Sequence, residues 1–292
     1  MSEPRPSSVL TGEWRDPAVP TVLVTDTLHG RSPGQGNEGR ERARGAQMVA
    51  PPDNDVLWAR GLHHAHGQSP ALTGISLGVR EGEILAVTGP RGSGKTTLLK
   101  CLSGQLVADS GEVWFHSHPV HTLSATSRER LRLDRFGWIG TEPRLVPELT
   151  AWENAALPLL VRGEGHRAAK QAAGEWLERL DVADCAKRRP AALDRAQQQR
   201  VSVARALATG PQVLFADEPT APLHRADAAQ VLRTIVNAAR SHAFSVVLAT
   251  QEAEAATLAD RTLALLDGRR SGAAAAEGPA ETEGREECSL SV

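Results

Sequence analysis

Apolar residues in the central part of the chain follow two kinds of spacing. Short apolar runs of the kind that form buried strands occur at residues 75–79, 84–88, 213–216 and 245–249. Helical spacing begins at Lys95 and returns at residues 201–207, in a helix for which Asp194 is a good N-cap. A mostly helical, polar stretch from about residue 141 to residue 208 separates the early strands from the later ones. Strands that alternate with helices predict an α/β domain with a mainly parallel sheet, and the helical stretch predicts an inserted subdomain.

The two ends of the chain differ from its centre in composition. Residues 1–53 are rich in Ser, Pro, Gly and Arg, and residues 269–292 are rich in Ala, Gly and Glu. Such segments bury too little apolar surface to offset the entropy lost on ordering, so both are expected to be disordered tails. A short apolar segment at residues 19–25 has strand character but no obvious neighbour to pair with. The predicted globular unit therefore runs from residue 54 to residue 268.

Charge and cysteine content narrow the class of protein. A net charge of −2 gives no electrostatic reason to expect nucleic acid as a partner. Cys101, Cys185 and Cys288 have no paired spacing, which fits a reducing cytosol. The sequence contains neither an apolar run as long as a membrane span nor the apolar segment of a signal peptide. A soluble, cytoplasmic protein is expected.

The motif that points most clearly to a ligand follows the predicted strand at residues 84–88. It reads GPRGSGKTT, opens a predicted helix and matches the pattern G-x-x-x-x-G-K-[ST]. Its glycines let consecutive backbone N–H groups face phosphate oxygens, Lys95 would neutralise the phosphates, and the Thr96 hydroxyl would bind Mg²⁺. A chance glycine turn matches this pattern in roughly one chain in a hundred. We therefore predict a nucleotide-binding site made of Gly89, Pro90, Arg91, Gly92, Ser93, Gly94, Lys95, Thr96 and Thr97.

A second motif places two carboxylates at the end of a predicted strand. The apolar run at residues 213–216 is followed by Asp217 and Glu218, at the carboxyl edge of the sheet where α/β folds bind ligands. Asp217 would hold Mg²⁺ through water, and Glu218 would polarise the attacking water. The alternative is two acids that only end a strand before a proline turn, and the phosphate loop upstream makes that interpretation the weaker one.

From about residue 55 to residue 268 the chain resembles the ATP-binding-cassette (ABC) ATPases. GPRGSGKTT resembles Walker A, VLFADE resembles Walker B, and LDRAQQQRVSVARALATGP resembles the signature helix. The stretches RFGWIGTEPRLVPELTAWENAALPLLVRG and SRERLRL resemble the lipoprotein-release and macrolide-export branch of that family.

The resemblance implies a P-loop NTPase cassette that adds an antiparallel β portion to the parallel sheet. It also implies ATP and Mg²⁺ as ligands, a second cassette in a head-to-tail dimer, and a separate membrane permease at the inner face of the cell membrane. The permease would meet the helical subdomain near residues 149–161, a stretch that equally fits simple subdomain core.

The chain also departs from the family's pattern at positions that close over or sense the nucleotide. The substituted residues are Thr141 for the Q-loop glutamine, Asp194, Arg195 and Ala196 for the signature Ser-Gly-Gly, His224 for the D-loop aspartate, His66 for the adenine-stacking tyrosine, and Gln251 for the switch histidine. Trp58 is a poorly spaced substitute for that tyrosine. Side chains where the family has glycine crowd the approach to a phosphate.

We therefore expect an ABC-type ATPase that binds ATP firmly and hydrolyses it slowly, with Glu218 and Gln251 at the catalytic positions. The alternative is a regulatory cassette that binds ATP without hydrolysing it and pairs with a competent partner cassette.

Overall fold

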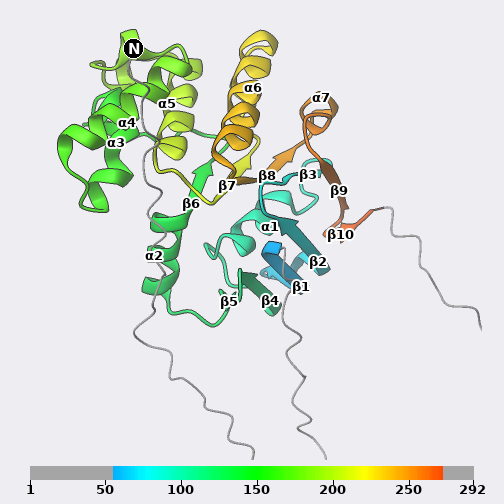
Figure 1. Ribbon diagram of the computed structural model, residues 1–292. Coiled ribbons are helices and arrows are strands. Elements are labelled where there is room, and N and C mark those ends of the chain that lie inside the picture. Colours follow the sequence, from blue (N-terminus) through cyan, green and yellow to red (C-terminus); the bar gives the residue numbers. More distant parts are fainter. Residues whose placement is uncertain (1–54, 272–292) are drawn as a thin grey trace, which may run out of the picture. The chain divides into compact units, whose positions relative to one another are not determined.

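The computed structural model describes residues 55–271 (Figure 1). The tail expected at residues 1–53, with the strand-like segment at residues 19–25, lies outside the described residues, as do residues 272–292 of the tail expected at residues 269–292. Within residues 55–271 two sheets and seven α-helices form an α/β fold, as the apolar pattern predicted.

One sheet is antiparallel and has the strand order β2-β1-β4-β5. Its strands are β1 (Asp55–His66), β2 (Ser69–Arg80), β4 (Ser110–Phe115) and β5 (His118–Pro119). The strand expected at residues 75–79 is thus the last half of β2, which pairs with β1 in a long hairpin. This hairpin ends at residues 66–69, and that end takes part in the candidate site.

The other sheet has the order β10-β9-β3-β8-β7-β6, and five of its strands run parallel. Its strands are β3 (Ile84–Thr88), β6 (Phe136–Ile139), β7 (Val213–Asp217), β8 (Ser245–Thr250), β9 (Arg261–Leu266) and β10 (Arg269–Arg270). Strands β3, β7 and β8 are apolar along nearly their whole length because both faces of the sheet are covered. Consecutive residues of β7 point to opposite faces of the sheet, so Leu214 and Phe215 pack into different hydrophobic clusters.

The end of the globular unit was predicted too early. Strand β10 (Arg269–Arg270) pairs with β9 beyond the expected boundary at residue 268. Asp267 and Gly268 form the two-residue connection with φ of 48° and 72°, and Asp-Gly with positive φ at both positions is typical of a tight hairpin turn. The polar composition after Gly268 hid this hairpin, although the Asp-Gly pair signals it.

The helices are α1 (Lys95–Leu102), α2 (Ala125–Arg135), α3 (Ala151–Val161), α4 (His166–Arg179), α5 (Arg195–Ala208), α6 (Arg225–His242) and α7 (Ala253–Ala256). Helices α3, α4 and α5 pack on one another and form the helical insertion (Figure 1). Their contact surface is rich in buried alanine, including Ala155, Ala169 and Ala204, so the helix axes can approach closely. No helix between residues 55 and 271 combines the length and the apolar composition that crossing a membrane requires.

Candidate nucleotide-binding site

The phosphate loop joins the carboxyl end of β3 to α1. Gly89, Gly92 and Gly94 adopt φ of 151°, 79° and 99°, respectively, which L-residues with a side chain rarely adopt. A Cβ atom on Gly94 would lie 2.3 Å from the carbonyl oxygen of Ala71, so the loop is also packed tightly against β2. The backbone therefore curls at the helix N-terminus, where N–H groups and the helix dipole favour an anion.

The Lys95 ammonium lies inside this curl. Its side chain is 6% exposed, and its Nζ donates hydrogen bonds to the carbonyl oxygens of Gly89 at 2.7 Å and Pro90 at 2.9 Å. The Nζ also lies 3.6 Å from Oε1 of Glu218. The ammonium is thus held at the centre of the loop, where it can face a phosphate with little rearrangement.

Thr96 and Asp217 meet at the edge of the parallel sheet. Asp217 ends β7, and the Thr96 hydroxyl in the first turn of α1 donates a 3.0 Å hydrogen bond to its Oδ1. Burial raises the pKa of the Asp217 carboxyl, the charge of Glu218 raises it further, and the Thr96 hydrogen bond lowers it. A hydroxyl and a carboxylate are hard oxygen ligands of the kind that Mg²⁺ prefers. The donor set fits Mg²⁺, whose charge would favour the ionised carboxylate.

Glu218 follows Asp217 with an unusual backbone conformation. Its φ is 48°, which is uncommon for a residue with a side chain, and its N–H donates a 2.9 Å hydrogen bond to the carbonyl oxygen of Ala249 in β8. Both carboxylate oxygens have donors from Gln251, because its Nε2 lies 3.0 Å from Oε1 and its backbone N–H lies 3.3 Å from Oε2. Gln251 and Lys95 therefore hold the carboxylate from two sides.

The beginning of α5 is a closed capping box. The Asp194 carboxylate accepts a 2.8 Å hydrogen bond from the backbone N–H of Gln197, and the Gln197 side chain accepts one of 3.2 Å from the backbone N–H of Asp194. Each side chain satisfies a backbone N–H group at the helix N-terminus. The N-cap expected at Asp194 is confirmed, and Arg195 and Ala196 occupy the first turn of the helix.

Thr141 also lies close to Asp217. Its hydroxyl donates a 3.2 Å hydrogen bond to the Asp217 carbonyl oxygen, so this short side chain contacts the backbone of β7. His224, by contrast, is only the residue before α6, and its side chain makes no cap hydrogen bond.

Gln199 is a residue of the site that the sequence analysis missed. Its side chain is fully buried, and its Nε2 donates hydrogen bonds to the carbonyl oxygens of Gly140 at 3.0 Å and Pro219 at 2.8 Å. It thereby connects α5 with the segments that adjoin Thr141 and Glu218. The sequence contains one signal for its burial. Gln199 lies four residues before the core residue Val203, so helical spacing places both side chains on the same face of the helix.

His66 reaches the phosphate loop from the end of the β1–β2 hairpin. Its Nε2 lies 3.0 Å from the Thr97 hydroxyl, and it lines a pocket of about 280 Å³ together with Ser69, Pro70, Ala71 and residues 92–97. Trp58 lies elsewhere, in the middle of the antiparallel sheet opposite Gly78 and Trp114.

Sequence comparisons agree with this arrangement. A family profile described as ABC transporter matches residues 72–221. LolD 2, a lipoprotein-releasing system ATP-binding protein of Caulobacter vibrioides, is 37% identical over 217 residues, which are 73% of this chain and 95% of that protein. YbbA, named as an uncharacterized ABC transporter ATP-binding protein of Escherichia coli, is 37% identical over 222 residues, which are 75% of this chain and 97% of that protein.

Solved structures of the ATP-binding cassette MJ0796 share the fold. A dimeric structure of MJ0796 superposes with a TM-score of 0.71 at 28% identity, covering 74% of this chain and 96% of that one. A dimer of the same cassette in a post-hydrolysis state bound to ADP and Pi superposes with a TM-score of 0.70. The chain belongs to the ABC transporter family, as an ATP-binding cassette.

Proposed function

We propose that this chain binds Mg²⁺-ATP and couples that binding, with slow hydrolysis, to transport by a separate membrane permease. The observation that carries the proposal is the arrangement of Lys95, Thr96 and Asp217 at one edge of the sheet. The backbone of residues 89–97 and the Lys95 ammonium would hold the phosphates. Thr96 and Asp217 would hold Mg²⁺, which neutralises charge on the phosphates when it is bound.

Glu218 is the residue that would polarise the attacking water. Each of its oxygens accepts one hydrogen bond from Gln251, and Lys95 lies nearby. A carboxylate has about four acceptor sites in all, so these contacts leave room for a water and mainly fix the direction in which Glu218 points. The slow hydrolysis proposed here would arise if Glu218 had to turn away from Gln251 to reach the attacking water.

A regulatory role without hydrolysis is the second candidate function. The capping box at Asp194 supports it, since the loop that would approach a partner's γ-phosphate carries a carboxylate and a closed hydrogen-bond pair. The dimeric structures of MJ0796 support pairing of this chain with a second cassette. In a pair with a different, competent cassette, only one of the two composite sites would contain Asp194.

We expect the triple substitution Asp194→Ser, Arg195→Gly and Ala196→Gly to strengthen ATP-dependent dimerisation at least fivefold. The substitution removes a negative charge and two side chains, and it frees backbone N–H groups to approach the partner's γ-phosphate. Sedimentation of the Glu218→Gln variant, with and without the triple substitution, measures the effect in a background that retains bound nucleotide.

Arg195→Gly alone is the control for this experiment. Arg195 is exposed in the first turn of α5, and a guanidinium there can pair with a phosphate by charge-assisted hydrogen bonds. If Arg195→Gly abolishes dimerisation while the triple substitution leaves it unchanged, Arg195 itself contacts the phosphate. The interpretation that residues 194–196 only obstruct the approach to the partner's γ-phosphate is then wrong.

We propose that the permease docks in a pocket between the helical insertion and the parallel sheet, at the inner face of the cell membrane. The pocket measures about 440 Å³ and includes Leu157, Pro158 and Val161 from α3, as well as Trp138 from β6. Residues Ala155 and Leu159 of the same helix are buried in the core. One face of α3 is therefore subdomain core, and the other lines the pocket.

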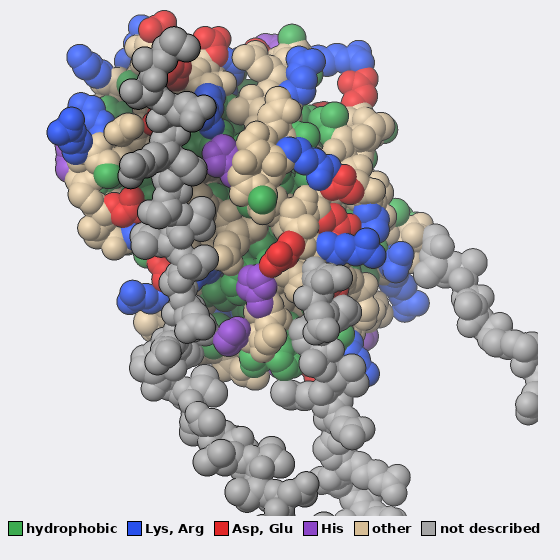
Figure 2. Space-filling view, viewed as in Figure 1, with side chains coloured by type: hydrophobic (Ala, Val, Ile, Leu, Met, Phe, Trp, Pro, Cys, Tyr) green, Lys and Arg blue, Asp and Glu red, His purple; other side chains and the backbone are tan. Residues whose placement is uncertain are grey.

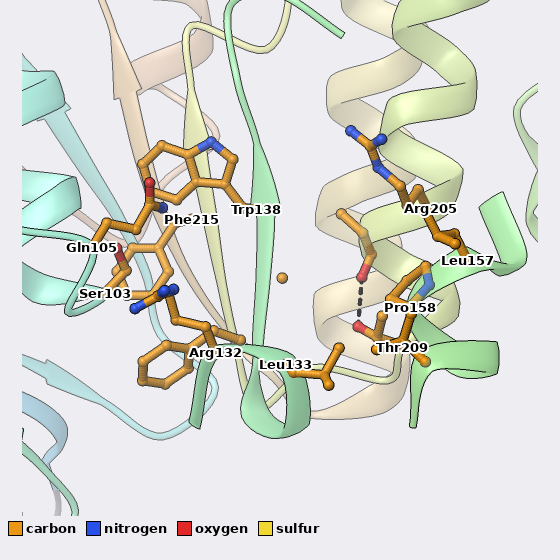
Figure 3. A pocket seen from close by; sticks show the side chains of 14 residues that line it. Ser103, Gln105, Arg132, Leu133, Trp138, Leu157, Pro158, Arg205, Thr209 and Phe215 are labelled. Atoms are coloured by element: carbon orange, nitrogen blue, oxygen red, sulfur yellow. Dashed lines mark hydrogen bonds between the residues drawn. The ribbon is translucent and has the colours of Figure 1, made fainter. Parts of the chain in front are cut away.

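The charge of the pocket indicates what kind of segment would fit. Figure 3 shows Arg205 on α5 and Arg132 on α2 on opposite sides of β6. Burial lowers the pKa of each guanidinium, and their hydrogen bonds within the described residues go to carbonyl oxygens and the Ser202 hydroxyl. An occupant with apolar side chains and a carboxylate would complement this lining.

A photoreactive side chain at Val161 is expected to cross-link to an integral membrane protein in membranes from the source cells. Val161 is 63% exposed beside the pocket, and Leu266 of β9 is a control of similar exposure at 50%. Cross-linking from Val161 and not from Leu266 supports the docking site. Equal cross-linking from both positions, or none from Val161, would refute it.

Acidic and basic side chains are interspersed over the face shown in Figure 2. The whole chain carries 33 basic and 35 acidic residues. This charge balance supports the proposal that the partners are proteins and not nucleic acid.

A further inference from the structure

The pocket beside α3 lies at an open edge of the parallel sheet. Within residues 55–271, β6 is the last strand on this side, because the strand order ends β8-β7-β6. Figure 3 shows residues that line the pocket on both sides of β6, with Leu157 and Pro158 on one side and Gln105 and Arg132 on the other. An edge strand leaves one row of backbone N–H and C=O groups without a neighbouring strand. The pocket is therefore placed to receive an extended segment that adds to β6.

The two sides of the pocket differ in chemistry. On the side of α3 the lining is apolar and consists of Leu157, Pro158 and Val161. On the opposite side Ser103 and Gln105 supply polar groups. Consecutive residues of an extended segment point in opposite directions. A segment that fits between these two sides would therefore alternate apolar and polar residues.

Each side also carries one partly buried guanidinium. Arg205 lies on the side of α3, and Arg132 lies on the opposite side of β6 (Figure 3). Arg205 donates to the carbonyl oxygens of Pro143 at 2.8 Å and Arg144 at 3.0 Å, and Arg132 donates to that of Gly104 at 2.9 Å. Within residues 55–271 neither guanidinium has a carboxylate as a hydrogen-bond partner. One carboxylate on each side of an added strand would complement them.

A stretch of the chain beyond the described residues has this pattern. Residues 286–292 read EECSLSV. The apolar residues Cys288, Leu290 and Val292 alternate with two serines, which is the spacing of a half-buried strand. The two glutamates that precede them would also point to opposite sides of an added strand. Glu286 would share a side with Leu290, and Glu287 would share the other side with the serines.

The connection from the described part of the chain to this segment is long enough to reach β6. Strands β10 and β6 lie at opposite ends of one sheet, and adjacent strands are about 4.8 Å apart, so the two are separated by about 24 Å. Residues 271–285 lie between β10 and the segment. Fully extended, this connection spans at most about 50 Å. The segment can therefore reach the pocket of its own chain.

We propose that residues 286–292 add to β6 as an extra strand and fill the pocket beside α3 while no permease is bound there. The apolar side chains of the segment pack against α3, where Glu286 faces Arg205. On the other side of β6, Glu287 faces Arg132. Binding of the segment does not depend on a permease. One consequence does rest on the proposed function: a permease that docks in this pocket has to displace the segment.

The test is hydrogen exchange of the full chain without nucleotide or permease, followed by mass spectrometry. Backbone N–H groups that are bonded to β6 exchange only when the added strand opens. Residues 288–292 are expected to exchange about tenfold more slowly, or slower still, than in a free peptide of the same sequence. Val161 is 63% exposed at the pocket, and Val161→Asp places a carboxylate against the apolar residues and glutamates of the segment. This variant is expected to exchange at the rate of the free peptide.

Leu266→Asp is the matched control, because Leu266 is 50% exposed and lies on β9, outside the pocket. It is expected to keep the protection of the wild-type chain. Exchange at the peptide rate in the wild-type chain, or protection that Val161→Asp leaves unchanged, overturns the inference. A contact within one chain does not depend on protein concentration. Protection that falls on dilution therefore means that the segment of a second copy is bound, which also overturns the inference.

The competition with a permease has a separate measurement. Leu290→Asp weakens the segment, and it is expected to raise cross-linking of a photoreactive side chain at Val161 to a membrane protein about threefold or more. Unchanged cross-linking contradicts the competition. If neither protein cross-links to a membrane protein while the exchange result holds, the proposed permease docking fails and the binding of residues 286–292 stands.

Discussion

The purified chain alone is expected to release phosphate from ATP no more than about twofold faster than its Glu218→Gln variant. In a dimer of identical chains both sites carry Thr141, Asp194 and Gln251, and Gln251 holds the Glu218 carboxylate with a hydrogen bond to each oxygen. Loss of one preorganised contact to the transition state commonly costs about 10²-fold to 10³-fold in rate. Against the usual turnover of roughly 1–10³ s⁻¹, even one such loss leaves little activity. A steady-state phosphate-release assay measures it.

Restoring the altered positions is the positive control. A variant with Thr141→Gln, Gln251→His and the signature substitutions at residues 194–196 is expected to hydrolyse ATP at least tenfold faster than the wild-type chain. The individual contributions are not additive within one catalytic unit, so the combined variant is the informative one. Fast wild-type turnover that Glu218→Gln abolishes would mean that Thr141, Asp194 and Gln251 are working substitutes.

The sequence predicted the architecture well where short-range patterns determine structure. The buried run at residues 84–88 is β3 in full, the helix expected from Lys95 is α1, and the strands expected near residues 213 and 245 are β7 and β8. These strands are apolar because both faces of a parallel sheet are covered. The P-loop NTPase cassette and its family were therefore predictable, and the comparisons confirm both.

Contacts between distant segments were not predictable from the same patterns. Motif spacing places Glu218 and Gln251 directly after two predicted strands, but it does not reveal that Gln251 donates to both oxygens of Glu218. Nor does it reveal that Gln199 joins α5 to two loops. Such hydrogen bonds depend on side-chain rotamers and on the positive φ of Glu218, which the tertiary structure imposes.

Three of the positions where the chain departs from the resembled pattern share a physical feature. The Asp194 carboxylate accepts a hydrogen bond from a backbone N–H of its own helix. The Thr141 hydroxyl donates one to the backbone of β7, and the Gln251 amide donates one to the Glu218 carboxylate. Each of these three side chains thus finds a partner inside the chain. The phosphate loop differs, because its tight turns and the buried Lys95 fit the geometry that phosphates need. This contrast supports ATP binding as the retained part of the function.

Binding of a labelled non-hydrolysable ATP analogue to the wild-type chain and to Lys95→Ala tests the central claim most directly. A hydrogen bond to a charged group contributes about 1.5–3 kcal/mol, so we expect Lys95→Ala to bind at least tenfold more weakly in the presence of Mg²⁺. Lys187→Ala, at an exposed lysine of the helical insertion, is expected to bind as the wild-type chain does. Equal affinity of the wild-type and Lys95→Ala proteins would contradict the assignment of residues 89–97 as the nucleotide-binding site.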